Sequence, residues 1–299
     1  MSFPSVSVVI PTYGDQEVIV DAVQSALSQT VSPVEVVVAS DGADPRKGDL
    51  LAALGDPRVR YVEAPHRRSA SATRNYGITK ARGDLVALLD DDDSWLPEKL
   101  DLQLRAYEQH GGGNLIVAGV EEIIALDGSS NRRPTKGFGR YRPEETLFRR
   151  GLGVHTSTLL APTTLFRAFP FNESIERHED WEWLLTAGRD VDLVIIPETI
   201  ARRVLRPGEG LSRPGGFKFS KTWYLANKSR MSKRTRSFCV TGVLSRKAAY
   251  DRNFTALPWL LCEHARTASL RPNGYLEMAA HWVLPNFLKT NIKRLKKLA

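Results

Sequence analysis

The sequence has few cysteines and no long apolar run, and each absence excludes a class of protein. Cys239 and Cys262 are the only cysteines in 299 residues, and their spacing fits neither a disulfide framework nor a zinc site. No stretch reaches the ~18 apolar residues of a membrane-spanning helix. Only Met1 to Ser5 precede the first strand-like run, so we expect no signal peptide. We expect a cytoplasmic protein, either soluble or peripheral on the inner face of a membrane.

Charge is distributed unevenly along the chain. Residues 1–213 contain 25 basic and 31 acidic residues, a net charge of −6, whereas residues 214–299 contain 17 and 3, a net charge of +14. An acidic part suits a bound divalent cation, and a basic part suits an anionic surface. We therefore divide the chain into a catalytic domain, 1–213, and a basic, mainly helical region, 214–299.

Short β-branched runs alternate with amphipathic segments in the first part of the chain. The runs predicted as strands are 5–11, 34–39, 59–62 and 85–89, and those predicted as helices are 17–29, 49–54, 70–81 and 97–110. This alternation predicts an α/β fold, a Rossmann-like, mostly parallel sheet with helices on both faces. We expect residues 1–110 to form one half of this domain and residues 111–213 to form a second half that completes the sheet.

Three polar motifs follow predicted strands: Pro11-Thr-Tyr13, Ser40-Asp41-Gly42 and Asp90 to Asp93. Ligands of parallel α/β sheets bind at the carboxyl ends of the strands, so the three motifs are expected to meet at one edge. The carboxylate of Asp41 could hold a base or ribose, or it could simply form an Asp-Gly turn.

The four adjacent aspartates, Asp90-Asp91-Asp92-Asp93, repel one another, and a hard divalent cation would relieve that repulsion. In an extended segment alternate residues share a face, so Asp90 and Asp92 are expected to point the same way. The alternative is a solvated acidic turn or a helix cap. The position at a strand end beside two other motifs favours metal and diphosphate binding.

Two further motifs allow both a functional and a structural interpretation. Arg74 lies in the helix that precedes the aspartates, where it could reach a diphosphate or be an ordinary surface arginine. Glu179-Asp180 opens an amphipathic helix, where acidic residues complement the helix dipole. A carboxylate there could also act as a general base toward an acceptor hydroxyl.

Five segments, ordered across roughly residues 5–213, carry a resemblance to a known family. They are Ser7-Val-Val-Ile-Pro-Thr-Tyr13, the run from Ser69 to Ile78, Ala81-Arg-Gly-Asp84 with Leu88 to Trp95, Phe171-Asn-Glu173, and His178-Glu-Asp-Trp181. Together they closely resemble family 2 glycosyltransferases, which have a GT-A fold.

The resemblance implies a nucleotide-sugar donor, with a uracil base, and a divalent metal, Mn²⁺ or Mg²⁺. Pro11, Tyr13 and Asp41 would hold the nucleoside, and Arg74 would approach the nucleotide or diphosphate.

Asp90, Asp91 and Asp92 fall on the family's Asp-x-Asp motif, with Asp92 as the metal ligand and Asp90 beside it. Asp180 falls on the catalytic base, with Glu179 next to it. The usual outcome in the family is inversion at the anomeric carbon.

One segment departs from the family pattern. Where the family often has a histidine after the last sheet strand, this sequence has Arg206, which cannot ligate a metal but could contact the leaving diphosphate. The third protein ligand of the metal is therefore open. His155 and His178 lie nearby in sequence, as structural or acceptor-side residues.

The basic C-terminal region ends in an amphipathic pattern over residues 286–298, with one apolar stripe and a basic opposite face. Such a helix could lie on an anionic membrane or pack as an ordinary terminal helix. No nucleic-acid-binding module is recognisable, so we expect no nucleic-acid partner.

These observations predict an inverting glycosyltransferase that builds a cell-surface polysaccharide or glycolipid on a saccharide or lipid-linked acceptor. The alternatives are an inactive nucleotide-sugar or membrane-surface binding protein, and a sugar-phosphate nucleotidyltransferase. The latter needs a glycine-rich phosphate loop after the first strand, which Pro11-Thr-Tyr-Gly14 does not supply.

Overall fold

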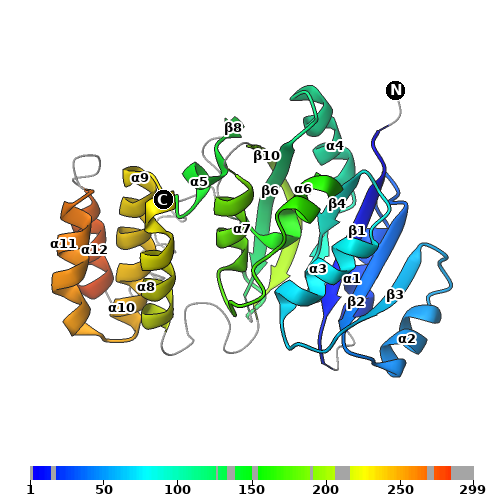
Figure 1. Cartoon of the computed structure of the whole chain (residues 1–299), viewed down its shortest axis with the longest axis horizontal. Coiled ribbons are helices and arrows are strands. Elements are labelled where there is room, and N and C mark those ends of the chain that lie inside the picture. The colour runs from blue at the N-terminus through cyan, green and yellow to red at the C-terminus, as the bar shows by residue number, and fades with distance from the viewer. Residues whose placement is uncertain are drawn as a thin grey trace. The chain divides into compact units, whose positions relative to one another are not determined.

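The computed structural model describes residues 3–14, 18–125, 127–132, 139–149, 154–188, 191–205, 216–267 and 273–283. Their contacts divide the chain into two compact units. The first unit contains residues up to 146 and 151–206, and the second contains 147–150 and 207–299. Each unit is described by itself below (Figure 1).

The first unit is built on a sheet with the strand order β3-β2-β1-β4-β9-β6-β10-β5, with β7 beside β6 and β8 beside β10. The strands are β1 (Val6–Thr12), β2 (Glu35–Asp41), β3 (Val59–Ala64), β4 (Leu85–Leu88), β5 (Asp93–Trp95), β6 (Leu115–Ile124), β7 (Ser130–Arg132), β8 (Gly139–Tyr141), β9 (Leu160–Pro162) and β10 (Asp192–Val204). The long pairings, β1 with β2, β2 with β3 and β6 with β10, are parallel, and the antiparallel pairings are short.

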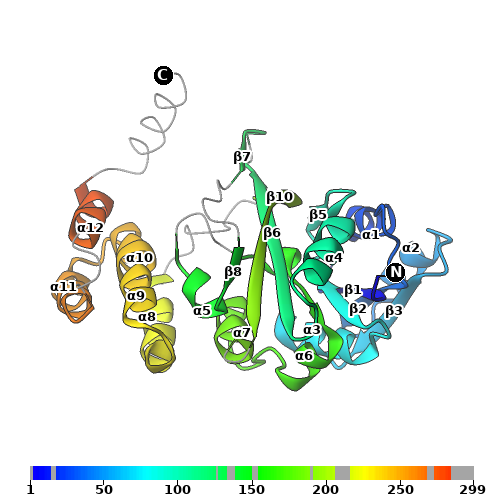
Figure 2. The ribbon, with the colours of Figure 1, turned by 90° about the horizontal axis from the view of Figure 1, so that it is seen from above.

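Helices cover both faces of this sheet (Figure 2). They are α1 (Ile19–Leu27), α2 (Pro45–Ala52), α3 (Ala70–Lys80), α4 (Lys99–Gln109), α5 (Pro143–Thr146), α6 (Thr163–Ala168), α7 (Glu179–Ala187) and the 3₁₀ turn η1 (Thr156–Thr158). All four helices predicted in the first 110 residues are present, with bounds shifted by a few residues.

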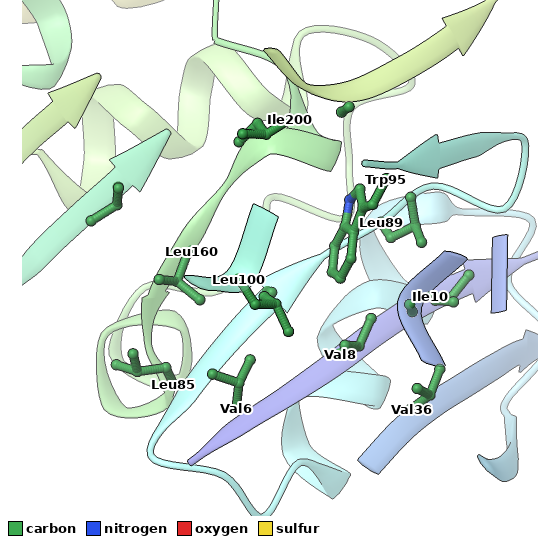
Figure 3. Packing of buried hydrophobic residues seen from close by; sticks show 14 of the residues in the cluster. Val6, Val8, Ile10, Val36, Leu85, Leu89, Trp95, Leu100, Leu160 and Ile200 are labelled. Carbon is green, nitrogen blue, oxygen red and sulfur yellow. The ribbon is translucent and has the colours of Figure 1, made fainter. Parts of the chain in front are cut away.

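Strand β1 is buried on both faces, as its run of β-branched residues predicts. On one side Val8 and Ile10 join Leu89 and Leu100 in the core beneath α1 and α4 (Figure 3). On the other side α3 approaches so closely that a Cβ at Gly77 would lie 2.7 Å from Val9 Cγ1. Only glycine allows this approach, which brings the helix carrying the predicted phosphate ligand against the sheet.

The second half of the sheet contains features that periodicity did not reveal. The three-residue strands β7 and β8 are among them. Strand β5 is only three residues long, and it places Asp93 opposite Arg203 of β10. Very short strands carry too little alternation to be recognised from sequence alone.

The second unit is helical within the described residues. It contains α8 (Gly216–Asn227), η3 (Lys228–Arg230), α9 (Lys233–Phe238), the π-helix η4 (Cys239–Leu244), α10 (Ser245–Tyr250), η5 (Phe254–Ala256), α11 (Leu257–Ala265) and α12 (Gly274–Val283). The η4 segment lies at its centre, with Cys239, Val240 and Leu244 buried. Within the described ranges, no helix has the length and hydropathy needed to cross a membrane.

Candidate active site

The four aspartates lie at the carboxyl end of β4 and form a turn. The amide of Asp93 donates to the carbonyl of Asp90 at 3.2 Å, and Asp91 and Asp92 occupy the central positions. The prediction that Asp90 and Asp92 share a face of an extended segment is therefore wrong. A turn instead brings its first and fourth residues together.

Asp93 is held at the base of this turn by Ser157. Ser157 Oγ donates to Asp93 Oδ2 at 2.5 Å and accepts from the Asp90 amide at 3.1 Å, while its carbonyl accepts from Trp95 Nε1 at 2.8 Å. Asp93 Oδ1 is buried without a hydrogen-bond partner in the part of the chain described. Burial, with the neighbouring negative charge of Asp90, raises the pKa of Asp93.

His155 completes a group of three candidate metal ligands with Asp90 and Asp93, whose ligand atoms all lie within 4.8 Å of one another. His155 Nδ1 is 3.5 Å from Asp93 Oδ2, and Nε2 is 4.0 Å from Asp90 Oδ2. Sequence reasoning named His155 only as a structural or acceptor-side residue, because it lies 62 residues from Asp93 and follows no ligand spacing. The signal that could have found it is the polar run His155 to Thr158 directly before a strand.

The donor set of this group fits a divalent cation. Two carboxylates and an imidazole are ligands that Mn²⁺ accepts, and the buried, unpartnered Asp93 Oδ1 is an acceptor that a cation would satisfy. Glu121 Oε2 lies 3.4 Å from His155 Nδ1 and 3.1 Å from Arg203 Nε.

Asp91 and Asp92 lie outside the group of three. Burial is the main cause that raises the pKa of Asp91 to about 6, and the charges of Asp92 and Asp90 add to it. Asp92 is half-buried in the turn. Its role as a metal ligand stays a prediction.

Arg74 projects from α3 toward the aspartate turn and is only 2% exposed. Its Nη2 donates to Asp90 Oδ1 at 2.9 Å, and its guanidinium carbon lies 4.9 Å from the ring centre of Phe171. Nε and Nη1 are buried and have no hydrogen-bond partner among the described residues. Buried donors are nearly always paired, so these two indicate a ligand with oxygen acceptors.

Asp41 ends β2 and holds the loop that leads into α3. Its two carboxylate oxygens accept from the amides of Arg67, at 2.6 Å, and Ser69, at 3.1 Å. Ser69 Oγ in turn caps α3 by accepting from the Ala72 amide at 3.2 Å. These hydrogen bonds are compatible with both interpretations of Asp41, as a ligand of a base or ribose and as a turn-forming residue, since each carboxylate oxygen keeps a second lone pair.

An aromatic pair lies beside Asp41. The rings of Tyr13 and His66 are 5.8 Å apart and inclined by 23°, and His66 Nδ1 is 3.0 Å from the Asp41 carbonyl oxygen. Tyr13 is 51% exposed, so its ring is accessible to a ligand. Pro11, two residues before Tyr13, lies near the carboxyl end of β1 and pairs in register with Ala39 of β2.

Glu179 and Asp180 form the first turn of α7, as predicted. His178 precedes them in the left-handed region, with φ of 67°, and its ring stacks on Trp181 at 3.9 Å. Asp180 Oδ1 accepts from the Trp181 amide at 2.8 Å. Burial, and then the like charge of Glu179, raise the pKa of Asp180.

Charged residues of α3 and of the aspartate turn affect the pKa of Asp180. The positive charge of Arg74 lowers its pKa and the negative charge of Asp90 raises it. Hydrogen bonds fix this placement: Asn75 of α3 donates to the Phe171 carbonyl and accepts from its amide, both at 2.9 Å. Asn172 then donates to Glu182 of α7 at 2.7 Å. The site thus brings α3, the aspartate turn and α7 together, while Arg206 lies outside the described residues.

Comparison with known proteins shows which family the chain resembles. The model of the family described as Glycosyl transferase family 2 matches residues 7–174. The succinoglycan biosynthesis protein ExoO of Rhizobium meliloti (strain 1021) is 36% identical over 144 residues, 48% of this chain and 41% of that protein. An uncharacterized glycosyltransferase of Rickettsia felis is 30% identical over 185 residues, 60% of this chain and 30% of that protein. The chain thus spans less than half the length of either relative.

The same fold occurs in solved structures. Residues 1–349 of S. aureus TarS, in complex with UDP-GlcNAc, align with a TM-score of 0.64 at 13% identity, covering 93% of this chain and 89% of that one. At this identity the similarity establishes the fold alone. The predicted α/β fold of GT-A type is confirmed.

Proposed function

The chain belongs to glycosyl transferase family 2, and we propose that it transfers a sugar from a nucleotide sugar to a hydroxyl group of a saccharide or lipid-linked acceptor. The observation that carries this proposal is Arg74. A fully buried guanidinium with two unpartnered donors, beside a candidate metal group, suits a diphosphate between the two.

We assign the donor to the carboxyl ends of β1, β2 and β4. Tyr13 would lie against the base and Asp41 near the nucleoside, with Pro11 beneath them. Arg74, with the aspartate turn from Asp90, would bind the diphosphate. The TarS structures solved with UDP-GlcNAc and with UDP support a uridine diphosphate sugar. The predicted contact of Arg206 with the diphosphate falls outside the described residues and stays a prediction.

The metal, Mn²⁺ or Mg²⁺, would be held by Asp90, Asp93 and His155, with Asp92 as the further ligand implied by the family motif. When bound, it supplies positive charge that stabilises the departing diphosphate. Asp91 lies outside this group, and burial raises its pKa to about 6, so the turn loses this negative charge only as the pH falls below that value.

We assign Asp180 as the general base. In the proposed reaction the acceptor oxygen attacks the anomeric carbon, and the bond from that carbon to the diphosphate oxygen breaks with its electron pair on the diphosphate. Asp180 takes the hydroxyl proton. Attack opposite to the leaving group inverts the anomeric configuration, and no covalent enzyme intermediate is needed. Glu179 acts on Asp180 by raising its pKa, since the two charges are adjacent.

The acceptor is proposed from the relatives. ExoO takes part in succinoglycan biosynthesis by its name, which supports a growing polysaccharide or its lipid-linked precursor. The predicted membrane contact through residues 286–298 lies outside the described residues and stays a prediction.

Calorimetry tests the donor site. We would titrate a panel of nucleotide sugars with Mn²⁺, with Mg²⁺ and without metal, into the wild type, Asp92→Asn and Asp49→Asn. Asp49 is exposed on α2, so its variant is the matched control. Metal-dependent binding that Asp92→Asn alone weakens is the expected result. Folded protein that binds no donor under any condition would contradict the proposal.

A transfer assay tests the chemistry separately. Asp180→Asn keeps the shape of the side chain but removes the base, so it should bind the donor normally and lose transfer. Wild-type turnover by this variant would refute the assignment. Donor binding by the wild type without transfer to any of a broad panel of acceptors would instead support the alternative of an inactive binding protein.

A further inference from the structure

Helices α11 and α12 of the second unit expose only apolar and aromatic side chains. The exposed positions are Pro258, Leu261, Cys262 and Ala265 on α11, and Tyr275, Leu276, Ala279 and Val283 on α12. We call these eight residues the apolar face. Leu276 and Val283 are 71% and 75% exposed. Amphipathic helices of a monomeric domain normally present charged residues to water, so this surface is unusual.

The two helices form one surface because they lie side by side and antiparallel (Figures 1 and 2). At one end the ring of Phe254, just before α11, lies 5.2 Å from that of Trp282 near the end of α12. At the other end His264 of α11 lies 4.5 Å from Tyr275 of α12.

Both helices also pack on η4 with their inner sides, where Leu260 and Met278 are buried. Their exposed sides therefore both point away from η4. Phe254, itself 65% exposed, extends the same surface at one end.

The surroundings of the apolar face are positively charged. All three acidic residues of the region 214–299 are engaged internally. Glu263 is buried and accepts from Tyr224, Lys228 and Arg266. The carboxylates of Asp251 and Glu277 accept from the Phe217 amide and from Thr241.

The side chains of Arg252, before η5, and of Arg266, after α11, are both exposed, although Arg266 also pairs with Glu263. The sequence after α12 adds five lysines and arginines in residues 284–299.

We propose that the apolar face inserts into the surface of an anionic lipid bilayer. An interfacial site needs apolar side chains that enter the acyl boundary and cations that remain at the headgroups, and this unit offers both. A second copy of the chain fits less well, since pairing two such faces would bring together two regions with a net charge of +14 each. The proposal does not depend on the sugar donor, because lipid binding is measured without it.

Cys262 provides a direct probe on the face itself. It is exposed, whereas burial raises the pKa of Cys239 and shields that thiol. An environment-sensitive fluorophore attached to Cys262 of the full chain should shift to shorter wavelength with vesicles of equimolar phosphatidylcholine and phosphatidylglycerol. Phosphatidylcholine alone should give little shift, and high salt should reduce it.

Leu276→Asp tests the face, and Leu225→Asp is its control, because Leu225 is an exposed leucine on α8, outside the apolar face. Leu276→Asp should weaken sedimentation with the anionic vesicles by about tenfold or more, since it places a charge at the acyl boundary. Leu225→Asp should bind like the wild type. Circular dichroism would confirm that both variants are folded.

Three results would overturn the proposal. The first is equal vesicle binding by all variants without a fluorophore shift, which would place the contact elsewhere, for example in residues 284–299. The second is a shift without lipid that grows with protein concentration, which would indicate a second copy of the chain. The third is no vesicle binding by the wild type.

Discussion

Replacement of Arg74 by methionine should leave the ligand-free protein about as stable as the wild type. The loss is one charged hydrogen bond to Asp90, worth ~1.5–3 kcal/mol, and a cation–π contact with Phe171, worth ~1–2 kcal/mol. The gain is relief of two buried unpartnered donors, Nε and Nη1, which cost ~1–3 kcal/mol each. Asp90 keeps 24% of its side chain exposed, so water can solvate it.

The same substitution should strongly reduce donor affinity. Two charge-assisted hydrogen bonds to a diphosphate contribute ~1.5–3 kcal/mol each, so their loss should weaken nucleoside diphosphate binding by about 100-fold or more. Urea unfolding would give the stability, and calorimetry with metal and nucleoside diphosphate would give the affinity.

The control for this experiment is Arg105→Met, on the exposed side of α4, where the arginine is 62% exposed and bound to Asp101. It should change neither quantity appreciably. If Arg74→Met instead lost the ~3–5 kcal/mol typical of breaking a buried ion pair and bound the diphosphate normally, Arg74 would be a structural residue and the proposed donor site would be refuted.

Two further predictions concern the other sides of the site. Burial and the charge of Glu179 raise the pKa of Asp180, so the transfer rate should fall with decreasing pH well above the range in which an ordinary aspartate is protonated. Glu179→Gln removes the neighbouring charge and should move this limb of the pH–rate profile to lower pH. An unchanged profile would contradict the role of Asp180 as base. Ser157→Ala removes the hydrogen bond to Asp93 and the acceptor of the Asp90 amide. It should lower the free energy of unfolding in urea by ~1–3 kcal/mol and weaken metal binding in calorimetry. Metal affinity equal to that of the wild type would show that Asp93 does not need the hydrogen bond from Ser157.

Sequence alone predicted the parallel half of the sheet well, because β1, β2 and β4 are buried on both faces and contain short runs of apolar, β-branched residues. The starts of α3 and α7 were also predictable, from Ser69, which caps the first, and from the acidic pair that opens the second. These are local signals, carried by residues that neighbour one another in the chain.

The composition of the metal group was not predictable in this way. It depends on a hydrogen bond that closes the aspartate turn and on a histidine brought in by the antiparallel strand β9, whose pairing with β4 is only three residues long. Treating the aspartates as extended chain selected Asp90 and Asp92, whereas the turn brings together Asp90 and Asp93. Such contacts arise from tertiary packing, which periodicity does not encode.

The described site concentrates features that a protein optimised for stability alone would avoid. Four adjacent carboxylates repel one another, Arg74 buries two unpartnered donors, and His178 adopts a left-handed backbone conformation. A cation and a diphosphate would relieve the first two together, because each supplies the charge that the other side of the site lacks. Since natural sequences break local rules mainly where function requires it, the coincidence of these features at one sheet edge argues for a donor site rather than an acidic surface turn.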